Sequence, residues 1–220
     1  MSDDPLPVPV SNERVRATYD RLAGAYERVL GPVEGASQRR AVATLAETTD
    51  LSGARVLEVG CGPGARLPGL ARRVGPTGTV VGLDAAAGMV GAARGRGGSV
   101  VRGDARRLPL ATGSVDAVCA LDVLELFSAA DLAAVLGEVR RVLRPDGRLC
   151  AVVMATDDVP DSGFLRAYEW AYRHLPGVAA VGCRPVDLDS ALADAGFVVE
   201  RRERAVRAGV WPVRAVVARL

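Results

Sequence analysis

A glycine-rich segment at residues 59–64, Val-Gly-Cys-Gly-Pro-Gly, lies between a short apolar run and a helical pattern. Glycine lets the backbone turn sharply and lets a ligand approach it closely. The start of the following helix offers backbone N–H groups that have no partner within that helix. Gly60-x-Gly62-x-x-Ala65 also matches a loose dinucleotide-binding pattern. By itself, the segment therefore indicates either a loop that binds a nucleotide-like ligand or a plain tight turn.

Three acidic residues stand where a nucleoside ligand needs hydrogen-bond acceptors. Glu58 precedes the glycines inside an apolar run, where its carboxylate can hold the loop or, through water, an ammonium group of the ligand. Asp84 ends the next apolar run, a position from which an acidic residue binds ribose hydroxyls. Asp104 follows a third run and can accept a hydrogen bond from an adenine amino group, although Asp104 alone also fits a solvated loop acid. The joint placement of the three acids argues against coincidence.

These residues need a scaffold, and the chain alternates between two hydrophobic periods. The pattern predicts strands at residues 55–59, 79–84, 99–102, 115–121 and 148–154. It predicts helices, single or paired, at residues 13–29, 35–47, 65–74, 86–94, 131–143, 164–174 and 187–195. Such alternation is typical of a doubly wound parallel sheet with helices on both faces.

The C-terminal segment differs from this alternation. Two strands are expected at residues 197–206 and 210–219, with three residues between them. So short a link makes a hairpin, because parallel strands need a longer crossover. We therefore predict a Rossmann-like α/β fold with a seven-stranded, mostly parallel sheet, an antiparallel C-terminal strand and an N-terminal helical cap.

Composition limits the classes of function. The 220 residues suit one domain, and the net charge of +2 gives no reason to expect a nucleic-acid partner. All 28 basic residues are arginine, so no lysine is present to act as a base or Schiff-base former. The four cysteines fit no zinc pattern, and we expect no metal and a reducing cytoplasm. Residues 1–12 are expected to form a flexible tail without signal-peptide character, and no apolar run suits a transmembrane helix.

Several segments resemble motifs of the class I S-adenosylmethionine (SAM)-dependent methyltransferases. Residues 56–64 (Val-Leu-Glu-Val-Gly-Cys-Gly-Pro-Gly) look like motif I, and residues 80–84 (Val-Val-Gly-Leu-Asp) resemble the next motif. Residues 102–105 with 108–110, 114–118 and 142–149 are similar to the following segments of that family. The resemblance covers residues 13–220 and implies one domain, with a cap at 13–50, a SAM-binding core at 51–155 and acceptor-side helices and a hairpin at 156–220.

The resemblance assigns a cofactor site residue by residue. The expected SAM-binding residues, with S-adenosylhomocysteine (SAH) as product, are Glu58, Gly60, Cys61, Gly62, Gly64, Asp84, Ala85, Met89, Asp104, Ala105 and Leu121. Met89 is expected to pack on the adenine, although methionine also fills helix cores.

The acceptor side resembles the ubiquinone/menaquinone-type and phospholipid N-methyltransferase-type enzymes, chiefly through residues 19–26. It implies substrate contacts, which equally fit plain packing, from Tyr19, Tyr26, Glu125, Tyr168, Tyr172 and Arg184. The candidate catalytic residues are His174, Asp122 and Tyr19. His174 is the only histidine and also fits a surface position.

The sequence thus predicts a SAM-dependent methyltransferase that acts on a small organic or lipid-like acceptor at oxygen, nitrogen or carbon. SAM carries an activated methyl group, so the enzyme mainly aligns the nucleophile and excludes water. Three alternatives stay open: a SAM-binding enzyme that catalyses another reaction such as cyclisation, a nicotinamide-dependent oxidoreductase, and a non-catalytic interaction module. The residues decide neither the acceptor nor a monomeric or dimeric state.

Overall fold

The computed structural model describes residues 11–154, 163–207 and 211–220. Within these ranges, seven strands form one sheet in the order β3-β2-β1-β4-β5-β7-β6. The strands are β1 (Arg55–Val59), β2 (Thr79–Asp84), β3 (Ser99–Arg102), β4 (Val115–Leu121), β5 (Leu143–Met154), β6 (Val198–Arg207) and β7 (Trp211–Arg219). Strands β1 to β5 pair in parallel, whereas β7 is antiparallel to both β5 and β6. The predicted fold is confirmed.

The helices follow the expected alternation with small shifts at their ends. They are α1 (Asn12–Leu22), α2 (Tyr26–Val29), α3 (Gly31–Thr48), α4 (Leu67–Val74), α5 (Ala87–Ala93), α6 (Ala129–Val142), α7 (Gly163–His174), α8 (Pro176–Ala179) and α9 (Leu188–Asp194), with a 3-10 turn η1 (Leu124–Leu126). Helix α3 begins four residues before its predicted start. Pro32 occupies its first turn, where the missing N–H of proline leaves no hydrogen bond unmade.

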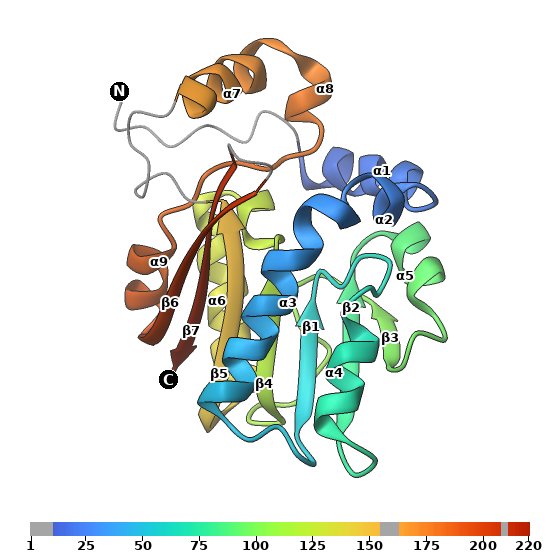
Figure 1. Cartoon of the computed structure of the whole chain (residues 1–220), viewed down its shortest axis with the longest axis vertical. Coiled ribbons are helices and arrows are strands. Elements are labelled where there is room, and N and C mark those ends of the chain that lie inside the picture. The colour runs from blue at the N-terminus through green and yellow to red at the C-terminus, as the bar shows by residue number, and fades with distance from the viewer. Residues whose placement is uncertain (1–10, 155–162, 208–210) are drawn as a thin grey trace.

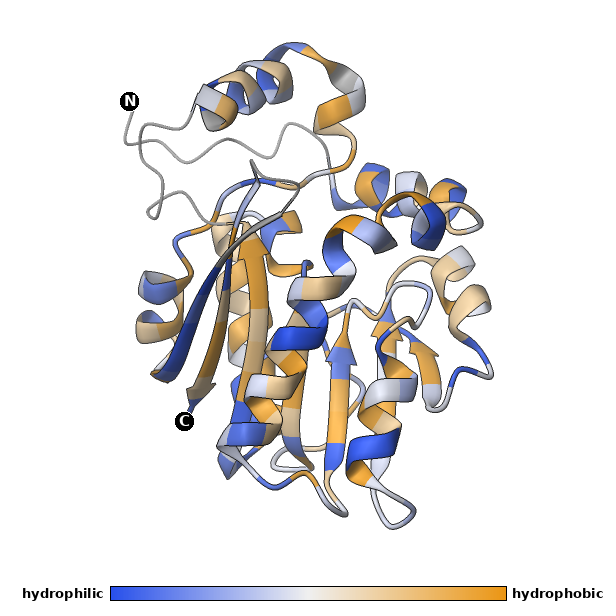
Figure 2. Cartoon of the chain, in the orientation of Figure 1, coloured by the Kyte–Doolittle hydropathy of each residue, from blue (hydrophilic) through white to orange (hydrophobic). Residues whose placement is uncertain are grey.

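Helices cover both faces of the sheet (Figure 1). Helices α3 and α4 pack on one face through an apolar cluster that includes Leu45, Leu67 and Leu70. Helices α6 and α9 pack on the other through a cluster that includes Leu136 and Leu192. The central strands between them are mostly hydrophobic along their length, as expected for strands that are buried on both faces, whereas the edge strand β6 is mostly hydrophilic (Figure 2).

Four further helices lie beyond the carboxyl ends of the parallel strands. Figure 1 shows α1, α2, α7 and α8 above these strand ends, while α3 starts beside α2 and then runs along the sheet. Ligands of open α/β sheets bind at the carboxyl ends of the strands, so these helices are placed to cover a site. Among the described residues, no helix is both long and apolar enough to cross a membrane.

Candidate functional site

The glycine-rich loop leaves β1 in a conformation that only glycine adopts without strain. Gly60, Gly62 and Gly64 have φ angles of +66°, +52° and +80°. A Cβ at Gly60 would overlap the Val123 side chain, and a Cβ at Gly64 would lie 2.9 Å from Ala93 Cβ. At Gly62 no atom lies within 4 Å of such a Cβ. The absence of a side chain at Gly60 and Gly64 thus allows the loop to pack closely against Val123 and Ala93, whereas the space next to Gly62 is open.

Asp84 ties the end of β2 to this loop. Its Oδ2 accepts a hydrogen bond from the Gly62 amide at 2.9 Å, and its Oδ1 accepts one from the Ala86 amide at 2.8 Å. Burial raises the pKa of the Asp84 carboxyl, while the two amides lower it. A carboxylate has about four accepting positions, so Asp84 keeps capacity for the two hydroxyls of a ribose.

Glu58 is a buried carboxyl group beneath the loop. Its side chain is 2% exposed, and no described group donates a hydrogen bond to Oε2. Burial raises the pKa of Glu58 to about 8, although the nearby Arg66 guanidinium lowers it. An acceptor that lacks a donor in a buried position suits a ligand that brings its own positive charge.

A cavity of about 540 Å³ opens at the carboxyl ends of the strands, a size typical of small-molecule sites. Ten of the eleven residues predicted to bind SAM line it: Glu58, Gly60, Cys61, Gly62, Asp84, Ala85, Met89, Asp104, Ala105 and Leu121. Gly64 does not line it and instead packs against α5. The strands therefore bring together residues that are up to 63 positions apart in the sequence (Glu58 to Leu121).

Asp104 lies at the rim of this cavity and is half exposed. The Arg106 guanidinium donates to it, with Nη2 2.7 Å from Oδ2. Hydrogen bonds from Arg106 hold the pKa of Asp104 below its usual range, so the group is a carboxylate near neutral pH.

The two predicted cap tyrosines also line the cavity. Their ring centroids are 5.8 Å apart. The Tyr19 hydroxyl donates to the Val181 carbonyl at 3.2 Å, and the Tyr26 hydroxyl donates to Glu34 Oε2 at 3.1 Å. Burial raises the pKa of both phenols, so both hydroxyls stay protonated and act as donors.

Asp122 reaches the cavity from the end of β4. It is the only non-glycine residue with a positive φ in the described parts of the chain, at +61°. Gln38 Nε2 of α3 donates to its Oδ2 at 2.8 Å. A sparsely populated backbone conformation of this kind is a common feature of functional positions.

Five of the predicted acceptor-side residues do not line the cavity: Glu125, Tyr168, Tyr172, His174 and Arg184. His174 is exposed on α7, with its ring stacked on Trp170 and its Nδ1 2.7 Å from the Trp170 carbonyl oxygen. The expectation that His174 faces the substrate does not match this position. Helix α7 turns Tyr168 and Tyr172 inward, and residues 170 and 174 are on its outer side.

The other four form a buried layer behind the cavity wall. The Tyr168 hydroxyl donates to the Cys183 carbonyl at 2.7 Å. Arg184 Nε donates to the carbonyl of Phe127, a cavity-lining residue, at 3.0 Å. Glu125 and Tyr172 are almost fully buried. These contacts stabilise the wall from outside.

The structure also adds residues that the sequence reasoning missed. Asn12, Glu34, Gln38 and Arg106 line the cavity. For Arg106, the sequence does contain an indirect signal. The spacing Ser128-x-x-Asp131 is a helix-capping pattern, and the capped helix start places Asp131 next to Arg106. Nothing in the sequence indicated that Gln38 would reach Asp122.

The fold and the site together define a Rossmann-like protein with a cavity at the carboxyl ends of its parallel strands. A family model described as a methyltransferase domain matches residues 56–147. The chain is 39% identical over 215 residues to nocamycin O-methyltransferase from Saccharothrix syringae, covering 83% of this chain and 72% of that protein. It is 33% identical to malonyl-[acyl-carrier protein] O-methyltransferase from Laribacter hongkongensis, covering 84% and 63%. The chain belongs to the class I SAM-dependent methyltransferases, a family of enzymes with SAM as cofactor.

The chain is also similar to one uncharacterised protein, and its fold matches solved structures. A 37.1 kDa transposon TN4556 protein of Streptomyces fradiae is 41% identical over 160 residues, covering 67% of this chain and only 44% of that protein. The fold matches magnesium protoporphyrin IX methyltransferase from Synechocystis, solved with SAH, at a TM-score of 0.73 and 21% identity, covering 95% and 99% of the two chains. A [4+2]-cyclase also matches, at 0.73 and 20% identity, with 98% of both chains covered. The family assignment favours SAM over a nicotinamide cofactor.

Proposed function

We propose that this enzyme transfers the methyl group of SAM to a small organic or lipid-like acceptor bound at the cap end of the cavity. One observation carries the proposal: a single cavity is lined both by the Gly60–Gly62 loop with Asp84 and by Tyr19, Tyr26 and Asp122. Two ligands that share one cavity can be aligned for in-line displacement, which supplies most of the rate enhancement that an activated methyl donor needs.

The proposed cofactor contacts follow from the hydrogen-bonding capacity of each group. Asp84 accepts from the ribose hydroxyls with the positions that Gly62 and Ala86 leave open. Asp104 accepts from the adenine amino group, with Met89 and Ala105 packed near the base. Glu58 accepts a hydrogen bond from the ammonium group of the methionine part, directly or through water, and the positive charge of that group favours the ionised carboxylate. SAM, when bound, supplies a methyl group on a positively charged sulfur.

On the acceptor side, we assign Asp122 as the group that accepts a proton from the acceptor or orients it. Gln38 Nε2 donates to Asp122 Oδ2 and so fixes the orientation of the carboxylate at the cavity. Tyr19 forms part of the cavity wall rather than acting as a base, because its hydroxyl stays protonated and donates to the Val181 carbonyl. Glu125, Tyr168, Tyr172 and Arg184 support this wall from behind.

The experiment is an acceptor screen that measures SAH release by the purified protein. The panel contains acceptors with a phenol, a carboxylic acid, an amine and an acidic carbon, each with a short and a long apolar tail. SAH release that depends on one acceptor supports the proposal and assigns the nucleophile. Consumption of an acceptor without SAH release would instead identify a non-methylating reaction such as cyclisation. SAH binding with no acceptor consumed at all would contradict the proposed catalysis.

A further inference from the structure

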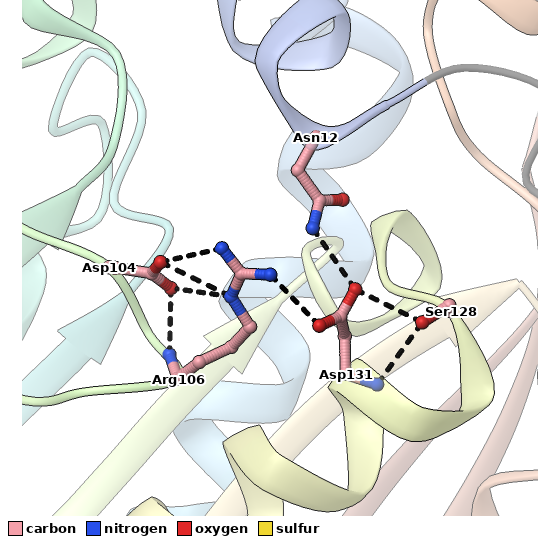
Figure 3. Close-up of polar contacts among 5 residues, drawn as sticks. All are labelled: Asn12, Asp104, Arg106, Ser128 and Asp131. Carbon is pink, nitrogen blue, oxygen red and sulfur yellow. Dashed lines mark hydrogen bonds and ion pairs between the residues drawn. The ribbon is translucent and has the colours of Figure 1, made fainter.

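A chain of polar contacts connects the rim of the cofactor cavity to the first residue of α1. Figure 3 shows it running from Asp104 through Arg106 and Asp131 to Asn12, with Ser128 at its side. Arg106 Nη1 lies 2.9 Å from Asp131 Oδ1, and Asn12 Nδ2 donates to Asp131 Oδ2 at 3.0 Å. Asn12, Asp104 and Arg106 all line the cavity, so the chain follows its edge.

Arg106 fixes the Asp104 carboxylate and leaves part of it open. Oδ1 accepts from the Arg106 backbone N–H at 2.9 Å and from Nε at 3.0 Å, and Oδ2 accepts from Nη2 at 2.7 Å. A carboxylate offers about four accepting positions. Nε also lies 3.2 Å from Oδ2, so its single hydrogen is shared between the two oxygens. Three N–H groups of Arg106 thus serve about four accepting positions, and the half-exposed carboxylate can accept one further hydrogen bond in an orientation that the guanidinium holds.

The other end of the contact chain is firmly anchored. Asp131 lies in the first turn of α6, where its amide donates to the Ser128 hydroxyl oxygen at 3.1 Å and its Oδ2 accepts from that hydroxyl at 3.0 Å. Helix α1 is also held at its far end, where Asp20 Oδ1 accepts from the Gly88 amide of α5 at 2.8 Å. Helix α1 thus contacts both α5 and α6, and its contact with α6 passes through Asp131.

We propose that Arg106 is a positioning residue for the cofactor, which orients the Asp104 carboxylate toward the exocyclic amino group of adenine and joins it through Asp131 to Asn12 of α1. The inference rests on the proposed adenine contact of Asp104. Binding at the adenine position and the placement of α1 are then coupled, because the same guanidinium contacts both carboxylates.

The first test measures selectivity for the base. Binding of SAH is compared with binding of its hypoxanthine analogue, in which a carbonyl oxygen replaces the adenine amino group. We expect Arg106→Ala to reduce the preference for SAH by about tenfold, the scale of one hydrogen bond to a charged group. Arg106→Lys is expected to retain part of the preference for SAH. A lysine ammonium group keeps the positive charge, but it does not span two carboxylates in the way that a guanidinium does. Arg107→Ala, at the exposed neighbouring position, is the matched control and leaves the preference unchanged.

The outcomes separate this inference from the proposed function. If Asp104→Asn leaves the preference for SAH unchanged, the adenine contact of Asp104 is wrong. If Asp104→Asn reduces it and Arg106→Ala does not, only the role of Arg106 is wrong. Tighter SAH binding by Arg106→Ala also overturns the inference, because Arg106 would then compete with adenine for Asp104. Thermal unfolding of each variant confirms that it is folded.

The second test measures the link to α1 as a double-mutant cycle on the SAH dissociation rate. We expect Asn12→Ala to accelerate dissociation about fivefold in the wild-type background. In the Arg106→Ala background, the same substitution is expected to have little further effect, because the contact chain is already broken. Independent, multiplicative effects of the two substitutions would overturn the coupling.

Discussion

The amide of Gly62 donates a hydrogen bond to Asp84 Oδ2 at 2.9 Å, across 22 residues of sequence. This bond joins the glycine-rich loop after β1 to the end of β2. The acceptor groups that we assign to the ribose are thus oriented by the protein itself, and little ordering remains for the ligand to induce. Affinity gained in this way comes from preorganisation as well as from direct contacts.

Gly60 and Gly62 are expected to differ in their tolerance of alanine. Both have positive φ, which costs an alanine about 1–2 kcal/mol. Only at Gly60 does the added methyl overlap another side chain, that of Val123, which adds about 1–3 kcal/mol of overpacking. Urea unfolding of Gly60→Ala and Gly62→Ala measures the difference. Equal free energies of unfolding for the two variants would contradict the loop geometry.

Glu58 is expected to make the folded protein less stable as the pH rises. Its pKa is about 8 in the folded state, against about 4.5 without burial, so the folded state binds more protons than the unfolded state between these values. The free energy of unfolding therefore falls from about pH 4.5 to pH 8, by up to roughly 5 kcal/mol for this group, and is constant above that range.

Glu58→Gln isolates this effect, because glutamine has the same shape and does not titrate. Urea unfolding at pH 5.5 and pH 8.5 is compared for the two proteins. We expect the wild type to lose several kcal/mol relative to the variant between these pH values. Parallel pH profiles for wild type and variant would mean that Glu58 is not buried as described.

Asp122 is expected to matter for turnover rather than for cofactor binding. If it accepts a proton from the acceptor, Asp122→Asn lowers kcat by about 10²- to 10⁴-fold. Asparagine tolerates positive φ, so the backbone at this position is expected to be retained. Steady-state kinetics with the acceptor found in the screen gives kcat, and calorimetry gives the SAH affinity, which we expect to be unchanged.

His174→Ala is the matched control for this prediction, because it removes the only histidine from an exposed position outside the cavity. We expect its kcat to equal that of the wild type. A large loss of kcat in His174→Ala together with full activity in Asp122→Asn would reverse the assignment.

Much of the fold and the cofactor side was predictable because both depend on local sequence signals. A run such as residues 79–84 encodes a buried strand, and the acid at its end falls at the edge where parallel strands meet. For this reason the sequence alone predicts that Glu58, Asp84 and Asp104 lie at the ends of neighbouring strands, and all three line the cavity. The antiparallel pairing of β6 and β7 follows from the short link between these two strands.

The acceptor side was less predictable because tertiary contacts decide it. The aromatic pattern of α7 indicates an amphipathic helix but not which side of it faces the protein. The sequence therefore predicts that His174 faces the substrate, whereas the structure has it exposed. Gln38 of α3 meets Asp122 from 84 positions away, and no periodicity encodes that contact. Arg106 contacts its near neighbour Asp104 and also Asp131, which is 25 positions away, and no periodicity encodes the second contact.

The most direct test of the account is a calorimetric titration of the wild type and Asp84→Ala with SAH. We expect the wild type to bind SAH at one site per chain with micromolar affinity. In the variant, we expect the binding free energy to be weaker by about 1–3 kcal/mol, the scale of lost hydrogen bonds to a charged group. Absence of SAH and SAM binding by folded wild-type protein, or equal affinity in Asp84→Ala, would contradict the assignment of this cavity as the SAM site.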